Sequence, residues 1–206
     1  MTKSFSFRPL IAAWQLLLSC AALGALLALA FSLVTPLQYS STVRLLITQP
    51  NATGLDPYTA IKSTERIATS LSELVYTTTS FNDILAQAKG FDPTYFPTDE
   101  INKRKMWSRA IEIAVTPGTG IMSVTAFHPN RDQARLLVDA TANEIAAQAP
   151  GYFGNIVHVQ VIDSPLDSRW YARPNFVSNG LFGFFIGLLL SLAWVLTKMT
   201  RSRERG

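Results

Sequence analysis

Two long runs of apolar residues stand near the two ends of the chain, and alternating apolar and polar positions fill the stretch between them. Residues 11–34 comprise 24 positions without a charged side chain, and residues 176–197 comprise another 22. As helices they would be about 36 Å and about 33 Å long, which exceeds the roughly 30 Å of a hydrocarbon core. The pattern therefore predicts two transmembrane helices with a folded segment, residues 35–175, between them.

Period-two alternation predicts four strands in this middle segment. On the first strand, Val43, Leu45 and Ile47 alternate with more polar neighbours and form one apolar face. The sequence Pro-Gly-Thr-Gly at residues 117–120 predicts the turn of a hairpin between the second and third strands. The four strands are expected over residues 38–48, 111–116, 121–127 and 157–161.

Helical periodicity predicts four helices among these strands. Ser80 with Asp83 three residues later indicates the start of the second helix, and Asn130 is a favoured N-cap for the last. The order β-α-(α,α)-β-β-α-β predicts an α+β fold, a ferredoxin-like sandwich in which the first and last strands are antiparallel neighbours. The four helices are expected over residues 58–78, 81–89, 99–108 and 131–148.

The distribution of charge predicts how the chain crosses the membrane. The segments outside residues 35–175 hold six basic residues and one acidic residue, whereas the middle segment holds 12 basic and 13 acidic residues. Lys and Arg beside membrane spans stay in the cytoplasm, so we expect cytoplasmic tails at residues 1–10 and 198–206 and an external middle domain. A nucleic-acid partner is not expected, because the folded segment carries no basic excess.

Two processing alternatives compete for the first span. Ala28-Leu29-Ala30 resembles a signal-peptidase site, and the residues before Cys20 faintly resemble a lipoprotein cleavage box. We expect an uncleaved anchor, because an apolar run of this length normally stays in the membrane. Cys20 is the only cysteine, so no disulfide can form within one chain.

Residue types that support catalysis are sparse, and we expect no enzyme, no cofactor and no metal site. His128 precedes a helix start, where a role in the local turn is expected, and His158 is expected to be exposed on a strand. Asp163 and Asp167 could be paired carboxylates, but we expect them to be solvated loop residues. No phosphate-binding loop of the Walker type is present, so nucleotide hydrolysis is not expected.

Two groups of residues remain as candidates for contacts with partners. Small residues on both spans predict close helix–helix packing, within one chain or between chains; they are Gly24, Ala28, Gly180, Gly183 and Gly187. A basic cluster on the expected helix 99–108 is either a solvated face or a contact to an anionic lipid, a pyrophosphate-linked glycan or a neighbouring subunit; it comprises Lys103, Arg104, Lys105 and Arg109.

Several segments, in their order along the chain, resemble the polysaccharide co-polymerases, or Wzz-type chain-length determinants. The segment 39–47 is similar to the family's first strand after its first span, residues 63–85 to its helix pair, and residues 115–124 to its central hairpin. Residues 128–134 followed by 139–143 resemble its "Pro then Ala, then Ala-Asn" helix. Residues 159–165 leading to residues 173–175 resemble the proline-containing run before the second span, with Pro165, Pro174 and Asn175.

The resemblance is closest to the short capsule-type adaptors that lack a fused tyrosine kinase. It implies a non-enzymatic homo-oligomer in a bacterial plasma (inner) membrane, with its central domain in the periplasm or outside the cell. The implied partners are a polysaccharide polymerase or flippase, a lipid-linked glycan and a separate cytoplasmic tyrosine kinase. For the kinase contact the candidates are Arg201, Arg203 and Arg205, which could equally be anchors beside anionic lipid.

The resemblance predicts regulation of the length or export of a capsule, exopolysaccharide or similar polymer. The sequence also leaves open a two-span sensor or scaffold whose external domain binds a ligand of the cell envelope. We expect such a sensor to carry a cytoplasmic signalling module, and the nine residues after Thr197 are too few for one, as they are for a kinase domain.

Overall fold

The structure of the chain is a computed structural model, and it describes residues 13–49 and 56–204. The chain divides into two compact units. One unit comprises residues 38–172, and the other combines residues 1–37 with residues 173–206. The predicted tail at residues 1–10 lies outside the described residues.

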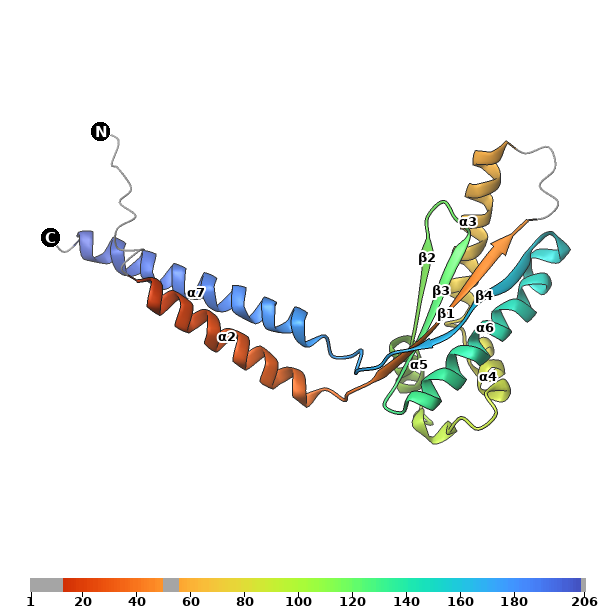
Figure 1. Ribbon diagram of the computed structural model, residues 1–206, viewed down its shortest axis with the longest axis horizontal. Coiled ribbons are helices and arrows are strands. Elements are labelled where there is room, and N and C mark those ends of the chain that lie inside the picture. Colours follow the sequence, from red (N-terminus) through yellow and green to blue (C-terminus); the bar gives the residue numbers. More distant parts are fainter. Residues whose placement is uncertain (1–12, 50–55, 205–206) are drawn as a thin grey trace. The chain divides into compact units, whose positions relative to one another are not determined.

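The 38–172 unit is an α+β fold built on one four-stranded antiparallel sheet (Figure 1). The spatial order is β2-β3-β1-β4, so β1 and β3 are central and β2 and β4 are edge strands. β1 pairs with β4 in antiparallel register, which confirms the expectation that the first and last strands are neighbours. The strands are β1 (Tyr39–Thr48), β2 (Ile111–Thr116), β3 (Ile121–His128) and β4 (His158–Asp167).

Helices cover the face of the sheet to which the apolar positions of β1 point. α6 packs along β1, β3 and β4, α3 contacts β1 and β2, and α4 lies against α6 (Figure 1). Val43, Leu45 and Ile47 are buried beneath these helices, while Arg44, on the opposite face of the strand, is exposed. The helices are α3 (Pro57–Leu74), α4 (Thr78–Gln87), α5 (Glu100–Ala110) and α6 (Arg131–Phe153).

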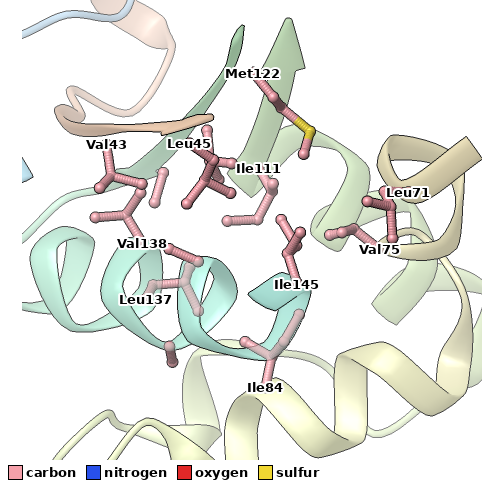
Figure 2. Packing of buried hydrophobic residues seen from close by; sticks show 14 of the residues in the cluster. Val43, Leu45, Leu71, Val75, Ile84, Ile111, Met122, Leu137, Val138 and Ile145 are labelled. Atoms are coloured by element: carbon pink, nitrogen blue, oxygen red, sulfur yellow. The ribbon is translucent and has the colours of Figure 1, made fainter. Parts of the chain in front are cut away.

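The core lies between the sheet and α6, and side chains from α3 and α4 complete it (Figure 2). Trp107 of α5 is also in this core, and its indole N–H donates to the carbonyl oxygen of Val75 (2.9 Å). A buried indole needs such a partner, because an unsatisfied N–H in an apolar core is costly. Figure 2 shows the central residues Val43, Leu45, Leu71, Val75, Ile84, Ile111, Met122, Leu137, Val138 and Ile145.

Several helix boundaries differ from the predicted ones. α3 ends at Leu74 rather than at residue 78, and α4 begins at Thr78 because Thr77 is its N-cap. The hydroxyl oxygen of Thr77 accepts from the backbone N–H of Ser80 (3.4 Å), and Ser80 itself is buried in the first turn. The predicted cap at Ser80 is therefore wrong by three residues, since an adjacent run of hydroxyl residues offers several possible caps. Asn130 does cap α6, but α6 continues past the expected end at residue 148.

The last strand is longer than predicted, and this corrects the interpretation of two acidic residues. β4 extends to Asp167, so Asp163 and Asp167 lie in a strand and not in a solvated loop. Asp163 forms an ion pair with Arg44 of β1 (3.7 Å), and Asp167 accepts a hydrogen bond from the hydroxyl of Ser41 (2.7 Å). The register shifts between Thr42 and Leu45 show a bulge here, which interrupts the alternation on which the sequence prediction depends.

The other unit contains two apolar helices, α2 (Trp14–Val34) and α7 (Phe176–Glu204). By length and composition, Trp14–Val34 and Phe176–Lys198 are long and apolar enough to cross a membrane. Only 11% and 22% of the residues in their most apolar windows are buried, so most of the apolar surface of both helices remains uncovered. A bilayer would cover this surface, whereas water would leave it exposed.

The hairpin turn between β2 and β3 provides a test of the packing at one end of the sheet. Gly120 has φ +66°, and a Cβ there would lie 2.7 Å from the carbonyl oxygen of Ile47 and 3.0 Å from the Thr64 side chain. Gly118 has φ +73° but no heavy atom within 4 Å of such a Cβ. Both sites therefore share the backbone penalty of a left-handed residue, and only Gly120 adds a collision.

We predict that Gly120→Ala destabilises the folded unit by about 1–3 kcal/mol more than Gly118→Ala. The larger destabilisation comes from the collision of the new methyl group with the Ile47 carbonyl oxygen. β1 cannot move away from the turn to relieve it without losing the bond from the Ile47 N–H to the Gly120 carbonyl oxygen (2.9 Å). Chemical denaturation of the detergent-solubilised chain, followed by circular dichroism, measures the difference. Equal destabilisation by the two substitutions would contradict the close approach.

Candidate functional site

Small residues bring α2 and α7 into close contact within one chain. A Cβ added to Gly183 would collide with the carbonyl oxygen of Gly24 and the methyl group of Ala28, and a Cβ on Gly187 would collide with the carbonyl oxygen of Cys20. Glycine is required at these positions because the two backbones touch. Of the five predicted packing residues, only Gly180 faces a side chain at ordinary distance, since its Cβ would lie 3.5 Å from Leu29.

One polar contact accompanies this apolar helix pair. The side-chain amide of Asn179 donates to the hydroxyl oxygen of Ser32 (2.9 Å), and Ser32 is 4% exposed. Polar side chains that pair across helices contribute to helix association in lipid, where water cannot satisfy them. Ser32 belongs to the small-residue face of the first span that the sequence indicates, whereas Asn179 was not singled out, although a polar residue inside an apolar run was an available signal.

The predicted proline-containing segment is divided between the two units. Pro165 is in β4, an edge strand, where the missing N–H of proline removes no bond from the interior of the sheet. Asn175 caps the start of α7, because its side-chain oxygen accepts from the backbone N–H of Ser178 (3.1 Å). Pro174 precedes this cap and follows a cis peptide bond. Pro165 therefore has a different role from Pro174 and Asn175.

The predicted basic cluster on α5 is arranged around one acid. Lys103 and Arg104 both form ion pairs with Glu100 (3.2 Å each), and the hydroxyl of Thr78 donates to the same carboxylate (3.0 Å). Hydrogen bonds from Arg104, Thr78 and Lys103 hold the pKa of Glu100 below its ordinary value. The carboxylate thus ties the start of α5 to the start of α4.

The remaining two cations of this cluster, Lys105 and Arg109, are exposed on α5. The pocket beside Lys103 and Arg104 has a volume of about 10 Å³, which is room for about one water molecule. It is too small for a sugar. A glycan or subunit contact at this cluster would therefore have to use the outer surface of α5, and it stays a prediction.

His128 occupies the turn position that the sequence predicts. Its Nδ1 accepts from the backbone N–H of Asn130 (3.0 Å), which places the ring immediately before the start of α6. The ring is 7% exposed and packs against Tyr95 and Phe91, with ring centroids 4.1 Å and 5.7 Å away. Its Nε2 has no hydrogen-bond partner among the described residues.

Burial is the main influence on the charge of this ring. Desolvation lowers the pKa of His128, and it outweighs the nearby Asn130 carbonyl oxygen, to which a protonated Nδ1 could donate (3.3 Å), and the carboxylate of Asp92, which both act to raise it. The neutral imidazole is therefore the form that fits the folded chain. His158, the only other histidine, is exposed on β4 as expected.

A buried carboxylate on α6 was missed by sequence reasoning. Glu144 is 5% exposed and accepts hydrogen bonds from the side-chain amides of Gln87 and Gln148. The hydroxyl of Ser80 in turn donates to Gln148 (3.4 Å). These bonds give the α4–α6 contact a polar centre, and the presence of an acid on an otherwise apolar helix face was the only sequence signal.

The last candidate residues are three arginines at the C-terminal end of the chain. Arg201 is exposed on α7, Arg203 lies on the same helix, and Arg205 lies outside the described residues. Across residues 13–49 and 56–204, no group of three or more His, Cys, Asp and Glu side chains lies close enough to hold a metal ion.

The comparisons with known proteins add no relative. No protein-family model matches the chain, and a search of curated proteins finds no significant match. The functional interpretation therefore rests on the residues and on the fold.

Close packing of the helix pair predicts a difference between two glycines. We expect Gly183→Ala to weaken the α2–α7 association by about 1–3 kcal/mol, because the new methyl group would overlap the backbone of Gly24. Gly180→Ala, which meets only the flexible Leu29 side chain, should have little effect. Titration with SDS in mixed micelles, followed by tryptophan fluorescence, measures both variants. If they behaved alike, the backbone contact at Gly183 would not exist.

The buried imidazole predicts a pH dependence of stability. Because the pKa of His128 is lower in the folded chain, the unfolded chain binds more protons just below the ordinary value of about 6.5. Stability should therefore fall as the pH drops from about 7 to about 5. His128→Gln should reduce this loss, whereas His158→Gln should leave it unchanged. Unfolding midpoints at both pH values decide the question, and an equal pH dependence in His128→Gln would refute the assignment.

Proposed function

We propose that this chain is a non-enzymatic, two-pass membrane co-polymerase that regulates the length or export of a bacterial surface polysaccharide. The observation that supports the proposal is that the segments resembling the co-polymerase family lie on the strands, hairpin and helix expected of them. Residues 39–47 fall in β1, residues 115–124 span the β2–β3 hairpin, and residues 159–165 fall in β4. The 128–143 segment covers the end of β3 and the first half of α6.

The architecture supports the same proposal. The order β2-β3-β1-β4 with antiparallel neighbours supports the proposal that the unit is a ferredoxin-like sandwich. The unit follows one apolar helix and precedes the other, and these two helices pack together through glycines. A domain held at both ends suits a scaffold whose geometry, rather than its chemistry, limits growth of a polymer.

In the proposed mechanism the external units assemble as a homo-oligomer beside the polymerase or flippase. The oligomer limits how long a lipid-linked glycan stays with the polymerase. Arg201, Arg203 and Arg205 are the proposed contacts for a cytoplasmic tyrosine kinase. The basic cluster on α5 is the proposed contact for the glycan or a neighbouring subunit, and it comprises Lys103, Arg104, Lys105 and Arg109. Catalysis, cofactors and nucleic acid have no part in this mechanism.

The size distribution of surface polysaccharide tests the proposal. We expect a deletion strain to show a shifted modal length or a loss of long polymer on a gel, and a strain complemented with the wild-type chain to recover the normal distribution. The empty vector is the control. An unchanged distribution and amount in the deletion strain would overturn the co-polymerase function and favour a two-span sensor or scaffold that binds a ligand of the cell envelope.

The proposed topology has a separate test. In a Cys20→Ser background, a cysteine at the exposed position Thr116 should react with a membrane-impermeant maleimide added to intact spheroplasts. A cysteine replacing Ser202 should react only after the membrane is opened, because basic residues hold that end in the cytoplasm. Labelling of residue 202 in intact spheroplasts would contradict the two-pass arrangement with cytoplasmic ends.

A further inference from the structure

The end of the 38–172 unit at which the chain enters and leaves carries an unusual surface. β1 begins there at Tyr39, and the backbone N–H of Ala172 donates to the carbonyl oxygen of Gln38 (2.7 Å). Tyr39 follows Val34, the last residue of α2, after five peptide units, which can reach at most about 17 Å. If α2 lies in a bilayer, the covalent chain keeps this end of the unit near the headgroups.

Large apolar and aromatic side chains are exposed at this end. Trp170 is 83% exposed, Leu166 is 77% exposed and Tyr171 is 45% exposed. Contact of these apolar side chains with water is unfavourable. Trp and Tyr are enriched at membrane–water interfaces, because the interface accommodates both an apolar ring and a polar N–H or O–H. The exposed side chains therefore fit a lipid surface.

The segment that presents Trp170 is held firmly against β1. The backbone N–H of Ser168 donates to the carbonyl oxygen of Ser40 (2.7 Å), and the N–H of Ser40 donates to the Ser168 hydroxyl oxygen (2.9 Å). The rings of Tyr39 and Tyr171 lie 4.6 Å apart between centroids. Trp170 is thus fixed between two anchored positions, and its exposure is not that of a loose loop.

Two arginines stand beside these aromatic side chains. The guanidinium of Arg131 lies 5.4 Å from the centroid of the Tyr39 ring and donates to the carbonyl oxygen of Arg169 (3.1 Å). Within the part of the chain that the structure describes, neither Arg131 nor Arg169 forms an ion pair.

Three acids lie near these arginines, and two of them, Asp167 and Asp139, interact with a third arginine, Arg135. Asp167 is engaged by Arg135 (3.6 Å), whereas Asp132 is exposed at the start of α6. Arg135 is thus offset by Asp167 and Asp139, whereas Arg131 and Arg169 have no ion-pair partner among the described residues and are the two cations open to an anion.

We propose that this end of the unit is a docking surface for the anionic phospholipid headgroups of the bilayer that holds α2 and α7. Trp170 and Leu166 enter the headgroup region, and Arg131 and Arg169 bind phosphate groups there. The contact fixes the height and tilt of the unit above the membrane. It rests on the membrane location of the two helices and is independent of any polysaccharide.

Fluorescence quenching in reconstituted vesicles tests the docking surface on the full chain. In a Trp14→Phe, Trp194→Phe background only Trp107 and Trp170 remain, and Trp107 is 1% exposed in the core. The vesicles contain phosphatidylcholine brominated near the headgroup end of its acyl chains, with or without phosphatidylglycerol. We expect quenching of Trp170 that increases with phosphatidylglycerol, and no quenching after Trp170→Phe is added.

Matched arginine variants separate the electrostatic contribution. Arg169→Gln should lower the ratio of docked to undocked units about fivefold in phosphatidylglycerol vesicles and have little effect in phosphatidylcholine alone. Arg66→Gln is the control, because Arg66 is an exposed cation on α3, close to the hairpin turn at the other end of the sheet.

Two results would overturn the docking surface. One is a Trp170 signal that is no more quenched than that of Trp107. The other is an increase of Trp170 quenching with phosphatidylglycerol that is unchanged in Arg169→Gln, or that Arg66→Gln reduces as much as Arg169→Gln does. Flotation of every variant with the vesicles shows that the helices are inserted, so failure of docking is distinguishable from failure of the membrane assignment. Because no polysaccharide is present, the outcome is also separate from that of the co-polymerase proposal.

Discussion

The antiparallel pairing of β1 with β4 is the constraint on which the rest of the structure depends. It joins the first strand of the folded unit to the last, and the bond from Ala172 to Gln38 continues the pairing to the points where the chain enters and leaves. Because β1 also pairs with β3, the same strand connects the β2–β3 hairpin to β4. A unit whose two ends are hydrogen-bonded together can be inserted between two apolar helices without separating them.

Different forces hold the two units together. The 38–172 unit buries apolar side chains between a sheet and its helices, so its stability comes mainly from removal of apolar surface from water. In a bilayer this force is absent between α2 and α7, and close backbone contact at Gly24 and Gly183 replaces it. Large side chains therefore stabilise one unit, and the absence of side chains stabilises the other.

The charged residues that the structure brings together are not the ones that stand out in the sequence. Lys103 and Arg104 form the most obvious basic cluster, yet Glu100 engages both of them in a local network. Arg131 and Arg169 are far apart in the chain, and the end of β4 brings them together beside exposed aromatic side chains. The proposed scaffold and the proposed lipid contact thus both depend on where the fold places ordinary surface residues.

The sequence by itself determined the features that arise from neighbouring residues: two apolar helices, the buried face of β1, the hairpin turn and the Asn130 cap. Periodicity and capping act over a few residues, so they are visible in a single chain. Only the tertiary structure decided the length of β4, the start of α4 and the burial of Glu144. The start of α4 depended on which of several adjacent hydroxyl residues forms the cap. The length of β4 and the burial of Glu144 depend on partners distant in sequence, such as Arg44 for Asp163 and Gln87 for Glu144, and local pattern carries no information about such partners.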